Sequence, residues 1–271
     1  MRLDLLLVER GLAESRAKAQ ALVMAGQVRV DGEVASKPAA SVLPDASVEV
    51  ERGPRFVSRG GEKLVAALDA FGLDVGGRIC ADVGASTGGF TDCLLQRGAA
   101  KVYAIDVGKG ILHWNLRNNP RVVVMEETNA RFVESLPEPV SLVTIDAAFI
   151  SLKILLPVIK KWLAPPSSLP LVEGHKDEGQ IIVLIKPQFE AGRKDVARGE
   201  GVIRDPDVHR QILFDVLGFA QSQGLGVRGL IKSPLLGPKG NVEFLAWIEI
   251  DEPAGIEELE SMIATVLAPP K

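Results

Sequence analysis

The stretch Ile79–Asp92, which reads ICADVGASTGGFTD, decides the fold of most of this 271-residue chain. Its apolar start, 79–83, predicts a buried parallel strand, and the small residues that follow predict a tight turn. Phe90, Leu94 and Leu95 then recur at helical spacing. A strand, a glycine-rich turn and a helix in this order present backbone N–H groups and a helix N-terminus to a nucleotide-like ligand.

A carboxylate supports this interpretation. Asp106 ends the next apolar segment, 101–106, where it can accept hydrogen bonds from ribose hydroxyls. The turn and the carboxylate together predict a nucleoside-type cofactor site. The alternative is that the glycines only let a helix pack closely on a strand.

Strands and helices alternate through the rest of the chain, which predicts an α/β fold with a doubly wound sheet. The expected parallel strands are 79–83, 101–106, 121–125, 141–146 and 180–186. Only a turn joins the last two expected strands, 226–232 and 241–250, so they should be antiparallel. The Pro- and Gly-rich segment 165–179 is expected to be a surface loop.

Residues 1–53 predict a separate small α+β domain, followed by a linker at 54–59 and the large domain at 60–271. Ser15 is the expected N-cap of a second helix, and a hairpin turning at Asp31-Gly32 follows it. Arg16 and Lys18 stand in the first turn of that helix, where cations oppose the helix dipole. An RNA phosphate backbone would favour cations there; the alternative is a solvated basic face.

Composition excludes several classes of protein. The chain is 46% hydrophobic and 24% charged with a net charge of −4, which is ordinary for a globular protein and no general sign of nucleic-acid binding. Its two cysteines and three histidines have no metal-ligand spacing, so we expect no metal. Without a signal-peptide pattern or an apolar run of roughly 20 residues, we expect a cytoplasmic protein that needs no membrane, as a monomer or weak dimer.

Charged side chains are expected to converge at the carboxyl edge of the sheet. Asp146 and Lys186 end strands, Glu243 lies in the last strand, and Lys63 lies in the helix before the sheet. Burying an unpaired ammonium is costly, so packing alone rarely explains a lysine that closes an apolar strand. Such groups suit methyl transfer to a weakly acidic hydroxyl, where a lysine acts as base or oxyanion stabiliser. The alternative is a structural Lys–Asp pair.

The N-terminal sequence resembles a known RNA-binding domain. The run RLDLLLVERGLAESRAKA, followed by GQVRVDGEV and Lys37-Pro38, is similar to the domain named after ribosomal protein S4. The resemblance implies binding of structured RNA through a positive helix-and-hairpin face. The RNA-binding residues that it implies are Arg2, Ser15, Arg16, Lys18, Arg29 and Lys37.

Five further motifs follow one another along the chain: Ser58–Leu64, Asp82–Asp92, Asp146 with Phe149–Leu152, Lys186–Glu190 and Asn241–Phe244. Together they resemble the TlyA family, whose members also carry the name hemolysin. The resemblance implies an S4-type domain joined to an FtsJ-like methyltransferase, with S-adenosylmethionine as donor. It also implies a cytidine 2′-hydroxyl of ribosomal RNA, within ribosomal subunits, as acceptor. The Lys-Asp-Lys-Glu tetrad of that fold carries over to Lys63, Asp146, Lys186 and Glu243.

The expected cofactor contacts follow from these positions: Asp82, Gly84, Ser86, Thr87, Gly88, Gly89, Phe90, Asp106 and Asn129. Asn129 could instead be a helix N-cap. The chain departs from the family pattern at Ala147-Ala148 and at 165–179. Rival interpretations are a hemolysin-type membrane-active protein, a non-catalytic RNA-binding factor and a dinucleotide-binding enzyme. The lack of long apolar segments, the intact tetrad and the antiparallel last strand weigh against them in turn.

Overall fold

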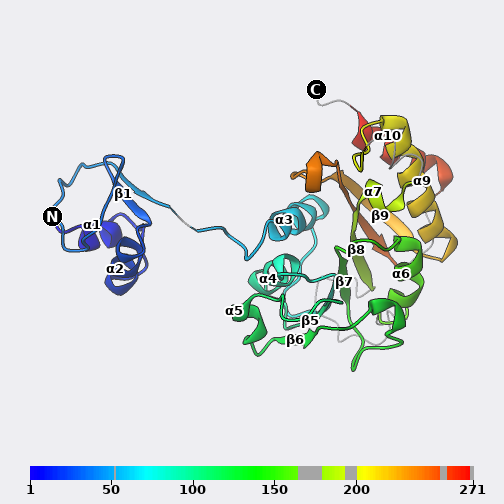
Figure 1. The fold of residues 1–271 in the computed structure, drawn as a ribbon, viewed down its shortest axis with the longest axis horizontal. Helices are drawn as coiled ribbons and strands as arrows, with labels where there is room; N and C mark the ends of the chain where they lie inside the picture. The colour runs from blue at the N-terminus through cyan, green and yellow to red at the C-terminus, as the bar shows by residue number, and fades with distance from the viewer. Residues whose placement is uncertain (52, 164–178, 193–199, 251–254, 269–271) are drawn as a thin grey trace. The chain divides into compact units, whose positions relative to one another are not determined.

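The computed structural model describes residues 1–51, 53–163, 179–192, 200–250 and 255–268. The chain divides into two compact units, Met1–Arg55 and Phe56–Lys271, each of which is described by itself. Figure 1 shows both units as ribbons.

The first unit is a small α+β domain, as predicted. Its elements are α1 (Leu3–Glu9), α2 (Arg16–Met24), β1 (Val28–Val30), β2 (Glu33–Val34) and β3 (Val48–Val50). The strands form an antiparallel sheet in the order β2-β1-β3. Ser15 caps α2 by accepting a hydrogen bond from the Lys18 N–H at 3.2 Å. A core that includes Leu3, Leu7 and Val23 holds the helices on the sheet.

The second unit contains the doubly wound sheet. Its strands are β4 (Ile79–Val83), β5 (Lys101–Ile105), β6 (Val122–Met125), β7 (Leu142–Ile145), β8 (Gln180–Ile185), β9 (Gly226–Lys232) and β10 (Phe244–Glu249). They form a 7-stranded sheet in the order β6-β5-β4-β7-β8-β10-β9. Strands β4 to β8 pair in parallel, whereas β10 is antiparallel to both β8 and β9. The predicted fold class is confirmed, including the reversed last strand.

Helices cover both faces of this sheet (Figure 1). One face carries α3 (Gly60–Phe71) and α4 (Gly89–Gln96), and the other carries α6 (Leu152–Ile159), α9 (Pro206–Ser222) and α10 (Ile256–Leu267). Short elements at the strand ends are α5 (Trp114–Arg117), α7 (Pro187–Glu190) and the 3-10 turns η1 (Ala130–Phe132) and η2 (Pro238–Gly240). Because each face has its own apolar cluster, the strands between them are buried on both sides.

Two details differ from the sequence expectations. Phe56, which falls in the expected linker, is 3% exposed and packs into the core of the second unit beside α3. The last strand begins at Phe244 rather than at Asn241, whose side chain bonds to Ile203 N–H and to the carbonyls of Gly201 and Pro238. Apart from Gly179, the expected loop at 165–179 lies outside the described residues.

Candidate active site

Two adjoining cavities open at the carboxyl edge of the parallel strands, where the strand order reverses between β4 and β7. Ligands of open α/β sheets bind at this place because loops from neighbouring strands diverge there. The first cavity has a volume of about 380 Å³ and the second about 280 Å³. Both are lined by Gly84, Ser86, Asp146 and Lys186, so these residues mark the junction of the two cavities.

The predicted tetrad forms two ion pairs that face the second cavity. Lys63 Nζ lies 2.5 Å from Glu243 Oε2, and Lys186 Nζ lies 2.7 Å from Asp146 Oδ1. The Lys186 ammonium also approaches the Asp146 carbonyl at 3.3 Å. A structural Lys–Asp pair, the alternative interpretation, is therefore present. It does not stand apart from a ligand site, because the same pair lines both cavities.

Glu243 contributes a second feature to this cavity. Glu243 is 1% exposed, and its Oε2 accepts a hydrogen bond from Lys63. Its Oε1 is buried and has no hydrogen-bond partner among the described residues. A buried carboxylate oxygen without a donor is costly, unless a ligand supplies one. Glu243 lines the second cavity, while its Oε1 lies against Gly237, where a Cβ would overlap it.

The glycine turn after β4 provides the floor of both cavities. Thr87, Gly89 and Phe90 line the second cavity in addition to the two shared turn residues. Gly84 has a φ of +81°, and a Cβ there would lie 2.7 Å from the Asp146 carbonyl oxygen. Only glycine therefore lets β4 and β7 approach at this point. Gly88 does not line either cavity; instead it lies against Leu112 and Leu116.

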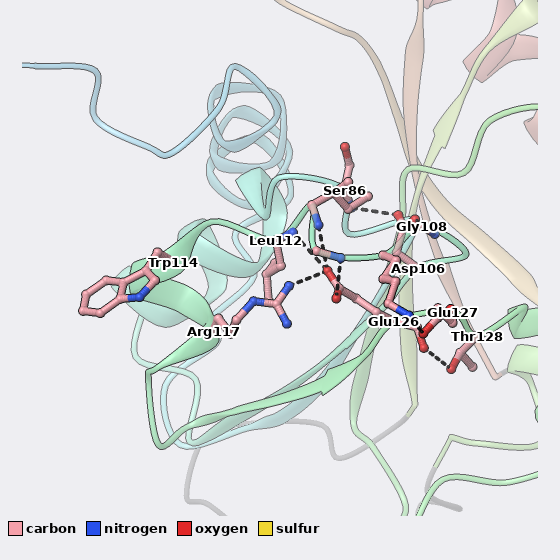
Figure 2. Close-up of polar contacts among 12 residues, drawn as sticks. Ser86, Asp106, Gly108, Leu112, Trp114, Arg117, Glu126, Glu127 and Thr128 are labelled. Atoms are coloured by element: carbon pink, nitrogen blue, oxygen red, sulfur yellow. Dashed lines mark hydrogen bonds and ion pairs between the residues drawn. The ribbon is translucent and has the colours of Figure 1, made fainter.

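Asp106 and Asn129, two of the expected cofactor contacts, both line the first cavity. The Asp106 carboxylate accepts hydrogen bonds from Ser86 N–H at 2.8 Å and Gly108 N–H at 2.7 Å, which fixes its orientation (Figure 2). Asn129 also caps η1 by accepting a hydrogen bond from Arg131 N–H at 3.1 Å. The two interpretations of Asn129 are thus compatible.

Asp82 is a correction to the expected cofactor contacts. Its side chain is fully buried and lines neither cavity. The carboxyl group accepts hydrogen bonds from Thr91 Oγ1 at 2.7 Å and Thr144 Oγ1 at 3.1 Å, so it ties α4 and β7 to β4. Burial raises the pKa of Asp82 to about 7. The reason is strand alternation: Asp82 and Val83 point to opposite faces of the sheet.

Phe149 lines the first cavity and lies beside a second aromatic ring, that of Phe189. Phe149 is 90% exposed with a φ of +63°, and its ring centroid lies 4.9 Å from that of Phe189. The Phe189 ring centroid in turn lies 5.7 Å from Lys186 Nζ. Ala147 and Ala148, where the chain departs from the family pattern, line the first cavity beside them.

Sequence reasoning missed several residues of this region. Ser58 and Arg59 line the second cavity ahead of α3. Glu190 accepts hydrogen bonds from Ser151 Oγ at 2.6 Å and Leu152 N–H at 2.7 Å, which holds the start of α6. The Glu126 carboxylate accepts hydrogen bonds from the backbone N–H groups of residues 110–112, in the segment after β5. Its signal was available, because Glu126 follows an apolar strand just as Asp106 and Asp146 do.

In the first unit, the expected RNA-binding arginines form ion pairs with carboxylates. Arg2 and Arg16 both pair with Asp4, which is fully buried, at 2.8 and 3.0 Å. The hydrogen bond from Arg2, joined by those from Gln20 and Arg16, holds the pKa of Asp4 well below its usual range. Arg29 pairs with Glu51 at 2.5 Å. The remaining expected residues, Ser15, Lys18 and Lys37, are exposed.

The first cavity fits an adenosine-like group. Apolar side chains such as Val107, Ile111 and Ile150 suit a flat base, and the oriented Asp106 carboxylate suits ribose hydroxyls. Within the described ranges, no group of three or more His, Cys, Asp or Glu side chains could hold a metal ion. The helices in these ranges also include none whose length and apolar composition would allow it to cross a membrane.

Comparison with known families assigns both units. The model of the FtsJ-like methyltransferase matches residues 56–250, and the model of the S4 domain matches residues 1–48. The first match contains both cavities and the whole tetrad.

Individual relatives agree with this assignment. The 16S/23S rRNA (cytidine-2′-O)-methyltransferase TlyA of Mycobacterium tuberculosis is 47% identical, covering 91% of this chain and 89% of its own length. Hemolysin A of Brachyspira hyodysenteriae is 41% identical, covering 91% and 98%. A solved structure from Streptococcus thermophilus, named as a hemolysin, is 39% identical, with a TM-score of 0.70 and coverage of 98% and 95%. The chain therefore belongs to the FtsJ-like methyltransferases of the TlyA type, which use S-adenosylmethionine as methyl donor.

Proposed function

We propose that this protein transfers a methyl group from S-adenosylmethionine to the 2′-hydroxyl of a cytidine in ribosomal RNA. One observation carries the proposal: two lysine–carboxylate pairs face a small cavity that adjoins the cavity suited to a nucleoside. The activity for which the M. tuberculosis relative is named supports the cytidine and the ribosomal RNA. The S4 domain supports an RNA substrate, which the protein would meet in the cytoplasm on ribosomal subunits.

The donor would lie across the two cavities. Asp106 would accept hydrogen bonds from its ribose, and Asn129 lies at the same wall, where the base would sit. The turn residues Ser86, Thr87 and Gly89 lead toward the second cavity, where the methionine end belongs. Bound S-adenosylmethionine supplies a methyl group activated by the sulfonium charge. Its transfer needs in-line alignment of the acceptor oxygen, which the junction at Asp146 and Lys186 would impose.

The tetrad would prepare the acceptor. As the new O–CH₃ bond forms and the C–S bond breaks, the 2′-hydroxyl proton would pass to Nζ of Lys186 while Lys186 gives a proton to the Asp146 carboxylate, 2.7 Å away. Lys186 thereby keeps its positive charge beside the reacting oxygen. Lys63, held by Glu243, supplies a positive charge that stabilises the developing alkoxide.

The first unit would dock the RNA. Arg2, Ser15, Arg16, Lys18, Arg29 and Lys37 are the side chains that we propose for this contact. Asp4 holds Arg2 and Arg16 in place, which reduces the entropy lost when they bind phosphates.

A methyl-transfer assay tests the proposal. Ribosomal subunits that lack the modification receive labelled S-adenosylmethionine and either wild type, Lys186→Met or Lys101→Met. Lys101 is the matched control, because it also pairs with a carboxylate, Glu138 at 2.5 Å, but lies outside both cavities. We expect label in alkali-resistant dinucleotides with wild type and control, since a methylated 2′-oxygen cannot attack the phosphate, and none with Lys186→Met.

Each unexpected outcome changes a different part of the proposal. Equal label with Lys186→Met would move the base to another residue. Label that alkali releases as mononucleotides would place the methyl group on a base and refute 2′-O-methylation. No label on either subunit would refute the ribosomal substrate.

A further inference from the structure

The segment after β5, residues 107–117, lines the first cavity at Val107 and Ile111, but no buried core anchors it there. Val107 and Ile111 line that cavity and are 68% and 40% exposed. Further along, Leu112 and Leu116 are buried against the glycine turn. Because apolar packing holds only its second half, the cavity wall itself needs another source of order.

Glu126, at the end of β6, supplies that order through polar contacts (Figure 2). Its carboxylate accepts the N–H groups of Gly110, Ile111 and Leu112 at 2.8, 3.0 and 3.1 Å. Arg117 Nη2 donates a fourth hydrogen bond at 2.6 Å. These bonds, that of Arg117 first, lower the pKa of Glu126 to about 2. The Glu126 side chain is therefore an anion at any working pH, and its negative charge holds the N–H groups of residues 110–112 in place.

The two residues after Glu126 hold the start of the same segment. Glu127 N–H donates to the Gly108 carbonyl and Thr128 N–H to the Asp106 carbonyl, both at 2.9 Å. Asp106 is the carboxylate that we place at the donor ribose. Residues 126–128 thus bond both to the start of the segment, at Gly108, and to its end, at Arg117. Glu126 itself does not line either cavity.

We propose that Glu126 is a positioning residue that sets the affinity for the nucleoside half of S-adenosylmethionine by ordering residues 110–112. It touches neither the donor nor the acceptor. The inference rests on the proposed placement of the donor in the first cavity, but it does not depend on which RNA accepts the methyl group.

The test is a Glu126→Gln variant of the full chain. Glutamine keeps the size, but it removes the charge and turns an N–H₂ donor toward backbone N–H groups that also donate. Loss of charge-assisted hydrogen bonds should weaken S-adenosylhomocysteine binding about tenfold by calorimetry. The KM for S-adenosylmethionine should rise by the same factor, while kcat at saturating donor and the KM for RNA stay within about twofold.

Two further variants separate positioning from a general loss of structure. Glu138→Gln is the matched control, because Glu138 accepts bonds from Lys101 and Tyr103 away from both cavities, and its donor KM should not change. Arg117→Met removes the ion pair but leaves three N–H donors on Glu126, so its effect should be smaller than that of Glu126→Gln. If Glu126→Gln does not fold, Arg117→Met still tests the proposal through its own donor KM.

The outcomes are distinct. Equal S-adenosylhomocysteine affinity in wild type, Glu126→Gln and Arg117→Met would overturn the inference. A loss of kcat without a change in donor KM would also overturn it. Wild type that binds donor but methylates no ribosomal RNA would refute the proposed acceptor and leave this inference standing.

Discussion

Replacing Gly84 with alanine should damage both stability and activity, because this glycine sets the distance between β4 and β7. A Cβ there would lie 2.7 Å from the Asp146 carbonyl oxygen, 2.9 Å from its carbonyl carbon and 3.0 Å from Ala147 Cα. These are backbone atoms, so no side-chain rotation relieves the contact. The φ of +81° adds the cost of a left-handed conformation, roughly 1–2 kcal/mol for an L-residue. Overpacking typically adds a further ~1–3 kcal/mol, so the sum is about 2–5 kcal/mol.

Gly72→Ala is the matched control. Gly72 ends α3 at a φ of +65°, but no atom lies within 4 Å of the position of its Cβ. The free energy of unfolding of Gly72→Ala should therefore fall only by the cost of the left-handed conformation, about 1–2 kcal/mol. Urea unfolding of both variants measures the free energies, and the difference between them isolates the contact with Asp146.

The same pair separates stability from chemistry. Displacing Asp146 moves the partner of Lys186 and the junction of the two cavities. We therefore expect Gly84→Ala to lose methyl transfer even at temperatures where it is folded, whereas Gly72→Ala keeps it. Equal destabilisation of the two variants, or normal transfer by Gly84→Ala, would refute the reasoning.

Two other predictions concern buried carboxyl groups. Burial raises the pKa of Asp82 to about 7, above the value of ~3.9 in an unfolded chain, so the folded state binds an extra proton between these values. Stability should fall as pH rises through that window, and Asp82→Asn should flatten the urea-measured profile; an unchanged slope would contradict this. The pKa of Asp4 is lowered by Arg2 and its other donors, so its stabilisation is present above pH ~4 and is lost as pH falls below it. Asp4→Asn should weaken RNA binding in a filter assay, because it releases Arg2 and Arg16. Asp45→Asn, on the exposed surface of the same unit, should leave RNA binding unchanged. Equal RNA affinities of the two variants would argue against the role of Asp4.

Local patterns were enough to predict the sheet. The apolar runs at 79–83 and 180–185 are longer and more continuous than half-buried strands allow, which indicates strands covered on both faces. The reversed last strand followed from the short turn before it. The position of Asp146 and Lys186 at the carboxyl edge followed too, because parallel strands end at one edge.

Local patterns could not show which way each side chain points. Asp82 and Asp106 both look like cofactor ligands in sequence, but Asp82 faces Thr91 inside the layer under α4. Asn129 both caps a turn and lines a cavity, and only the packed structure shows that one amide does both. Glu126 follows an apolar strand as Asp106 and Asp146 do, but only the packed structure shows that its carboxylate binds three backbone N–H groups and Arg117.

The sequence by itself determined the class of fold and the two-domain order, because hydrophobic periodicity and turn chemistry act over a few neighbouring residues. Tertiary structure alone decided which carboxylate pairs with which lysine. Lys63 and Glu243 are 180 positions apart and Asp146 and Lys186 are 40 apart, so no local rule connects them. Their pairing depends on how the strands lie side by side and on the electrostatic cost of leaving any one of these charges buried and alone.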